Sequence, residues 1–132
     1  MYEYKLIVGR IISIICNLLL LFFGALMVYT IFKQNTGSGA AAQWLFAIIL
    51  GIAALAGVFT GLISTFVEIP IVYMNFISPI VSIVMAMVLT SYAAKEPSGS
   101  ANMILLISGA GLLLIHPVGT ILIVSAEGRE ID

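Results

Sequence analysis

The chain has 132 residues, of which 62% are hydrophobic and 8% charged, with a formal net charge of −1 and a mean hydropathy of +1.24. About a quarter of the residues in a soluble domain are charged, so this composition indicates an integral membrane protein, with the lipid bilayer as its first partner. The sequence has no cluster of basic residues of the kind that binds nucleic acid, so nucleic-acid binding is not expected.

The first apolar run, "IISIICNLLLLFFGALMVYTIF", follows Arg10 and contains 22 residues without a charge. It is longer than the apolar core of a signal peptide, which has about 7–15 residues, and matches the roughly 20 needed to cross a bilayer. A retained transmembrane helix is therefore predicted over 7–32. The single cysteine, Cys16, lies inside this run and can form no intramolecular disulfide.

Three further spans follow. The turn-rich segment "NTGSGAAAQ" precedes a helix predicted over 43–67, and "AAKEPSGSAN" precedes another over 102–126. Between them, a helix starting at Pro79 would be only about 21 Å long, too short for a hydrocarbon core of about 30 Å. The third helix is therefore predicted over 70–93, with Pro79 as an internal kink.

These spans predict one domain over 1–132: an all-α membrane protein built as a four-transmembrane-helix antiparallel bundle. An even number of spans puts both termini on one side. That side carries three basic residues and the other side carries two, which favours cytoplasmic termini. The residues concerned are Lys5, Arg10 and Arg129 against Lys33 and Lys95.

Glu68 interrupts the apolar sequence between Trp44 and Tyr92. A tight hairpin before Pro70 would place its carboxylate at the membrane surface, as an N-cap-like residue near the positive end of the third helix dipole. Alternatively, the second helix extends to Glu68, and the acid points toward a neighbouring helix or a central axis. An acid in that position is a candidate cation site.

Ala53, Gly57 and Gly61 are spaced four residues apart along the second span. Small residues at this spacing allow the backbones of two helices to approach closely. They predict a helix-packing face, used either within the bundle or between copies of the chain.

Asn17 and His116 are polar residues deep within the first and fourth spans, at similar depth from the side of the termini. A hydrogen bond between them would satisfy two groups that hydrocarbon otherwise leaves unpaired. The alternative is a proton-relay or ligand-binding role for the histidine. The structural pair is favoured, because Pro117 frees a carbonyl nearby.

Catalytic motifs are not found in the sequence. No His/Cys/Asp/Glu cluster has metal-ligand spacing, and no nucleophile elbow or P-loop occurs. The chain is therefore predicted to be non-enzymatic and to need no cofactor.

The layout, with four spans, short loops and a V-E-x-P sequence after the second span, resembles the Flower family and its relatives, the TVP proteins of the yeast Golgi. The matching residues are Val67, Glu68, Ile69 and Pro70. The resemblance implies a small protein of Golgi or vesicle membranes. It also implies for Glu68 the selectivity role proposed in a calcium channel. COPI-associated Golgi proteins and MARVEL-type proteins share the layout and stay alternatives.

Two functions are left open. The first is a structural or trafficking role in the endomembrane system, as a homo-oligomer or as a subunit of a larger membrane complex. The second is an oligomeric cation channel with a ring of Glu68 carboxylates, for which calcium is one candidate ion. A channel requires oligomerisation, because one four-helix protomer is too small to enclose a pore.

Overall fold

The computed structural model describes residues 2–68 and 72–128. In chain order these residues form α1 (Tyr2–Gln34), α2 (Ala41–Phe66), the 3₁₀ helix η1 (Val72–Phe76), α3 (Ile77–Ala93), α4 (Ala101–Leu113) and α5 (His116–Ala126). Within the described ranges, four helical segments are long and apolar enough to cross a membrane. They are Glu3–Gln34, Ala41–Phe66, Tyr73–Ala93 and Ala101–Ala126.

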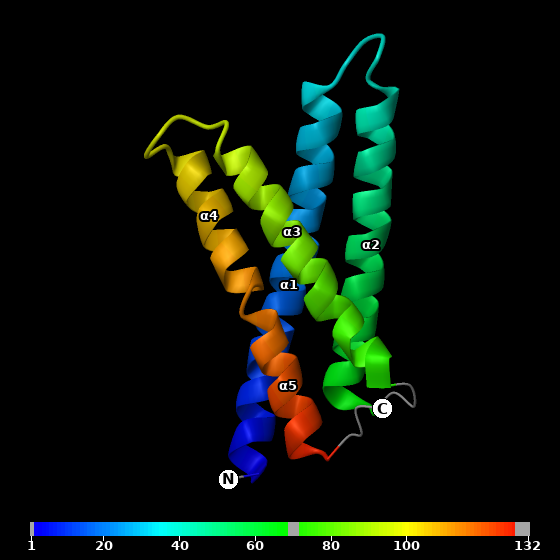
Figure 1. Cartoon of the computed structure of the whole chain (residues 1–132), viewed down its shortest axis with the longest axis vertical. Coiled ribbons are helices and arrows are strands. Elements are labelled where there is room, and N and C mark those ends of the chain that lie inside the picture. Colours follow the sequence, from blue (N-terminus) through cyan, green and yellow to red (C-terminus); the bar gives the residue numbers. More distant parts are fainter. Residues whose placement is uncertain (1, 69–71, 129–132) are drawn as a thin grey trace.

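The predicted all-α, four-span antiparallel bundle is confirmed. The start of α1, the end of α2, η1 and the end of α5 lie at one end, called here the terminal end (Figure 1). The loops 35–40 and 94–100 lie at the opposite end, called the loop end (Figure 1).

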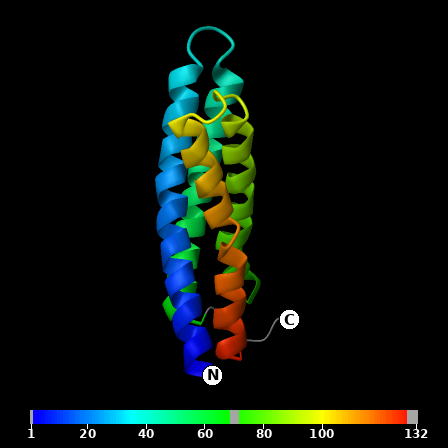
Figure 2. The ribbon, with the colours of Figure 1, turned by 90° about the vertical axis from the view of Figure 1, so that its left-hand side faces the viewer.

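The two helical hairpins are close at the terminal end and diverge toward the loop end. α1 runs beside α2, and α5 packs beside the first half of α1. α3 starts next to α2 and crosses the bundle to pair with α4, as the two perpendicular views show (Figures 1 and 2).

The third span differs from its prediction. Residues 69–71, including Pro70, lie outside the described residues, and regular α-helix begins only at Ile77 after the 3₁₀ turn of η1. Pro79 therefore lies in the first turn of α3, where a backbone N–H has no partner within the helix. The third span thus includes Pro79 as predicted, but the proline lies where 3₁₀ geometry gives way to α-helix and not in the middle of a regular α-helix.

The fourth span, predicted as one helix, is broken into α4 and α5. Pro117 has no N–H to donate to Leu113, and its ring crowds that carbonyl. The backbone narrows to 3₁₀ geometry across the break, with Ile115 N bonded to Leu112 O at 3.1 Å and Val118 N to Ile115 O at 3.0 Å. As a result, His116 is the first residue of α5, inside the bundle.

The core between the polar residues of the terminal end and the loop end is apolar; this part of the bundle is called the loop half, and the rest the terminal half. Buried side chains recur every three or four residues, for example Leu20, Phe23, Met27 and Ile31 on α1. They pack on residues of the other long helices: Ala47, Leu50, Ala54 and Val58 on α2, Met85, Ala86, Leu89 and Ala93 on α3, and Leu106, Ala110 and Leu113 on α4. Leucine, isoleucine and phenylalanine side chains also cover the outer faces, as expected where helices meet lipid.

Candidate functional site

Glu68 lies at the terminal end of the bundle and is exposed. α2 ends at Phe66 and Val67 is extended, so the helix does not persist to Glu68 as the ion-site interpretation required. The N-cap of α3 is Phe76, so Glu68 does not cap that helix either. The described chain therefore leaves regular helix before the acid, and Glu68 lies in the exposed connection after α2 at the terminal end, as the hairpin interpretation predicted. What is not found is the extension of the second helix to Glu68 or a cap by Glu68 on α3.

Gly57 and Gly61 lie at contacts between α2 and its neighbours. A Cβ atom on Gly57 would come within 3.1 Å of the Leu20 side chain and 3.2 Å of Val81. Ala53 is half-buried, and it is the next residue, Ala54, that packs on Gly24 of α1. These contacts are within one chain, so this face of α2 is used to build the bundle.

Gly61 makes room for the polar centre of the molecule. A Cβ atom there would overlap the side chains of Asn17 and Ser78. Since glycine has none, the Ser78 hydroxyl reaches Asn17 and donates to its Oδ1 at 2.7 Å. The same hydroxyl oxygen lies 2.9 Å from Nε2 of His116.

The predicted direct bond between Asn17 and His116 is therefore replaced by a bridge. Both side chains point to the same place, but Ser78 of α3 stands between them and bonds to each. The prediction considered only the first and fourth spans, whereas the third span enters the same layer.

The bonds continue from Asn17 toward the terminal end. Asn17 Nδ2 donates to Ser13 O at 2.8 Å and lies 3.3 Å from Ser13 Oγ. Ser13 Oγ is 2.7 Å from Oγ1 of Thr65, which donates to Gly61 O at 2.6 Å. Arg10 closes the series, because its Nε donates to Thr65 O at 3.1 Å and its guanidinium lies over the Phe66 ring.

We call Ser13, Asn17, Thr65, Ser78 and His116 the polar network. Each is at most 2% exposed, and together they join α1, α2, α3 and α5. Leaving such groups unpaired in hydrocarbon would cost several kcal/mol each, roughly, so their mutual bonds strongly favour this one arrangement of helices.

The direction of each proton in the polar network follows from its acceptors. The Ser13 carbonyl can only accept, so the atom of Asn17 facing it is nitrogen, and Oδ1 faces Ser78. The Ser78 hydroxyl donates its only hydrogen to that oxygen, so it must act as the acceptor toward His116. Nε2 of His116 is therefore the protonated ring nitrogen. His116 Nδ1 is then the acceptor, 3.5 Å from Thr120 Oγ1. A neutral imidazole satisfies this pattern.

Ser82 contrasts with Ser78. It lies one helical turn further along α3 and is equally buried, yet its hydroxyl has no hydrogen-bond partner among the described residues. A narrow crevice beside the polar network, too small for a water molecule, is lined by Ser13, Ser64, Asn75, Thr120, Ile123 and Val124.

Sequence reasoning missed Ser13, Thr65 and Ser78, although a signal was available. Polar or small residues pair at a spacing of four on every span that contributes, which places them on one helix face. The pairs are Ser13 with Asn17, Gly61 with Thr65, Ser78 with Ser82 and His116 with Thr120.

The described residues bring no three His, Cys, Asp or Glu side chains together in a way that could hold a metal ion. The polar network consists of neutral hydroxyl, amide and imidazole groups, with one cation, Arg10, at its outer end. Such groups can bind helices to one another through directional bonds.

Fold and site together define an all-α, multi-pass integral membrane protein whose spans are joined by a buried polar network. No family model, no curated protein and no solved structure matches the chain. The resemblance to Flower and TVP proteins stays a prediction.

Proposed function

We propose that the chain is a non-enzymatic structural or trafficking protein of the endomembrane system, which works by helix packing and self-association. The observation that carries this proposal is the closed interior of the terminal half. The polar network joins helices of the same chain through Ser13 with Thr65, and through Ser78 with both Asn17 and His116. Its remaining bonds, such as Thr65 to Gly61 O, stay within one helix. This arrangement serves a rigid scaffold better than a route for ions or substrates.

Self-association requires a face other than Gly57 and Gly61, which pack inside the bundle. A groove of about 500 Å³ runs between the outer sides of α1 and α2. Ala25 and Gly51 lie in it, flanked by apolar side chains such as Leu21 and Ile48. Small residues between larger ones suit the insertion of a helix from a second copy.

The endomembrane location and the cytoplasmic termini rest on sequence. The four-span layout and the sequence Val67-Glu68-Ile69-Pro70 support a Golgi or vesicle membrane by resemblance. The larger number of basic residues near the terminal end supports its cytoplasmic exposure. Imaging of a tagged chain with compartment markers tests the location, and a plasma-membrane signal alone would contradict it.

Disulfide cross-linking tests self-association through the groove. In a Cys16→Ala background, Ala25→Cys should give covalent dimers in membranes, because a second copy would bring two such residues together. Met87→Cys is a matched control: Met87 is 67% exposed on α3, away from the groove. Equal cross-linking of both variants, or none in either, would contradict the proposed contact.

The second candidate function is an oligomeric cation channel. One observation favours it: Glu68 is exposed at the terminal end and lies outside the polar network. An acid in that place is available to line an axis between copies. Reconstituted vesicles test this directly. A calcium flux abolished by Glu68→Gln, but kept in the matched Glu3→Gln variant at the same end, would replace the structural role by the channel.

A further inference from the structure

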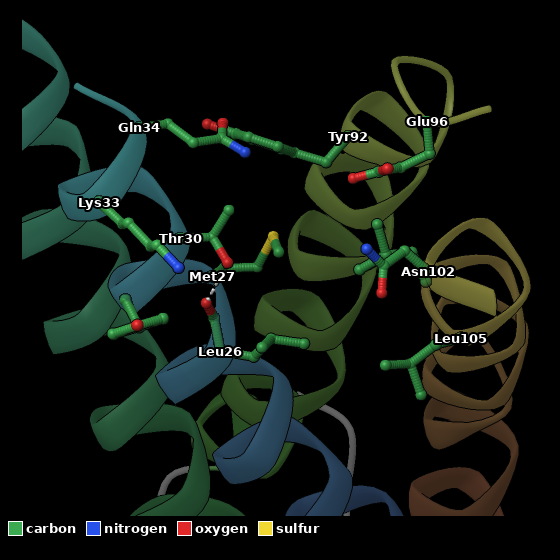
Figure 3. Close-up of a pocket in the computed structure, with 11 residues that line it drawn as sticks. Leu26, Met27, Thr30, Lys33, Gln34, Tyr92, Glu96, Asn102 and Leu105 are labelled. Atoms are coloured by element: carbon green, nitrogen blue, oxygen red, sulfur yellow. Dashed lines mark hydrogen bonds between the residues drawn. The ribbon is translucent and has the colours of Figure 1, made fainter. Parts of the chain in front are cut away.

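A pocket of about 410 Å³ opens at the loop end, where the two hairpins diverge (Figure 3). α1 forms one wall, and the end of α3 with the start of α4 forms the other. The Ser100 side chain fixes the start of α4 by accepting from Met103 N at 3.2 Å.

The floor of the pocket is apolar. Leu26 and Met27 of α1 face Leu105 and Leu106 of α4 across it. The Thr30 hydroxyl, which also lines the pocket, donates to Leu26 O of its own helix at 2.8 Å. This floor suits a hydrocarbon chain and offers little to a polar ligand.

The rim of the pocket is polar and carries both signs of charge. Lys33 lies on the α1 wall, and Glu96 projects into the gap from the opposite wall (Figure 3). Gln34 and Tyr92 point toward each other across the top, and Asn102 stands below Glu96 (Figure 3). Glu96 is half-buried, and its carboxylate points into the gap between the two walls (Figure 3).

The rim lies at the level of lipid headgroups. Arg10 and Lys33 are 23 residues apart on one helix, or about 34 Å, close to the hydrocarbon thickness of about 30 Å. Trp44, whose Nε1 donates to Asn35 O at 2.6 Å, marks the same boundary as an interfacial aromatic. Leu26, seven residues before Lys33, is about 10 Å deeper, where acyl chains lie.

We propose that this pocket binds a zwitterionic phospholipid of the surrounding bilayer. The phosphate lies against the Lys33 ammonium, the headgroup amine lies toward the Glu96 carboxylate, and one acyl chain runs along Leu26 and Leu105. A lipid is favoured over a soluble ligand because the pocket is polar at headgroup depth and apolar deeper in the membrane. A phospholipid has the same order, with its headgroup at the surface and its acyl chain below. A zwitterionic lipid is favoured over an anionic one because the pocket is lined by a cation, Lys33, and an anion, Glu96.

Lipid binding is measured by native mass spectrometry of the full chain, released from nanodiscs that contain phosphatidylethanolamine and phosphatidylglycerol. Phosphatidylethanolamine should be retained preferentially. Lys33→Gln and Glu96→Gln should each weaken its retention about fivefold, since each loses one charge-assisted contact. Lys5→Gln is the matched control, because Lys5 is an exposed lysine of α1 at the terminal end, far from this pocket.

A second pair of variants tests the acyl-chain half without changing a charge. Leu105→Trp should fill the floor and weaken lipid retention about tenfold, whereas Ile104→Trp on the adjacent lipid-facing position should not. Circular dichroism confirms that each variant is folded. Glycerophosphoethanolamine, the headgroup without chains, should compete only weakly.

Four results would overturn the proposal. Retention unaffected by Lys33→Gln, Glu96→Gln and Leu105→Trp would place the lipid elsewhere. Preference for phosphatidylglycerol would reject the zwitterion, and equal competition by the free headgroup would reject a lipid. If the dimer binds less lipid than the monomer, the pocket is occupied by a second copy of the chain and not by lipid. Lipid retention is measured separately on the monomer and on any dimer, so a failure of self-association leaves the lipid result on the monomer interpretable.

Discussion

At the terminal end the spans meet through hydroxyl, amide and imidazole groups, whereas at the loop end they meet through leucine, phenylalanine, methionine and alanine side chains. Hydrogen bonds are directional and require a particular register, while apolar contacts tolerate sliding and separation. Lipid tails compete with apolar contacts, since they are as apolar as the helices. The hairpins accordingly stay together at the terminal end and diverge at the loop end, where the pocket opens (Figure 1).

The largest expected effect comes from a substitution of Gly61 that disrupts packing at the terminal end. Gly61→Ile places a branched side chain where Asn17 and Ser78 now meet, so that α1 and α3 must move away from α2. We expect a loss of about 3 kcal/mol in stability, at the upper end of overpacking costs. Thermal unfolding in detergent micelles, followed by circular dichroism, measures it.

Gly111→Ile is the control for that substitution. In the described part of the chain, no atom outside its own helical surroundings lies within 4 Å of a Cβ built there, so stability should change by less than about 0.5 kcal/mol. Similar losses at Gly61 and Gly111 would mean that helix propensity, not the crowded centre, explains the effect.

A smaller effect is expected from removal of the bridge itself. Ser78→Ala leaves Asn17 Oδ1 and the Nε2 proton of His116 without their partner, at a cost of about 1–3 kcal/mol. Ser82→Ala makes the same chemical change one turn away, at a buried hydroxyl without a partner, and should be neutral or stabilising. If both serine variants unfold at the same temperature, the polar network does not hold the terminal end.

The coupling of Asn17 to His116 sharpens the comparison further. Both residues bond to Ser78, so Asn17→Leu and His116→Leu should be non-additive, by roughly 0.6 kcal/mol and up to about 2. The same double-mutant cycle in a Ser78→Ala background should show no coupling. Coupling that persists without Ser78 would point to direct contact between the two residues.

Much of the fold could be predicted from the sequence because length and hydropathy decide how many helices span a bilayer. The four spans, their antiparallel order and the burial of Asn17 and His116 follow from that argument. The position of Pro79 in a helix start could not be predicted, since local 3₁₀ geometry depends on how the chain turns after α2.

The site was harder to predict than the fold. The approach of Ser78 to Asn17 depends on the rotation of three helices about their axes, which the absence of a side chain at Gly61 makes possible. Similarly, Gly9 and Gly119 allow α1 and α5 to come together, with a Cβ on Gly119 within 2.7 Å of the Ile12 side chain. Spacing indicates which residues share a face, but which helix that face meets depends on tertiary packing.

The smallest expected effect concerns a hydroxyl of the loop half. Thr90 Oγ1 donates to Ala86 O of its own helix at 2.7 Å, so it joins no two spans. Thr90→Val keeps the shape of the side chain, and stability should change by less than about 0.5 kcal/mol. The same unfolding assay as for Ser78→Ala makes the two results comparable. The Ser78 hydroxyl donates to another helix, whereas the Thr90 hydroxyl donates within its own helix. Comparing the two variants therefore shows whether stability depends on the hydroxyl itself or on a hydrogen bond between helices. A loss at Thr90 equal to that at Ser78 would show that hydroxyls stabilise these helices one by one, and the distinction between the two ends of the bundle would fail.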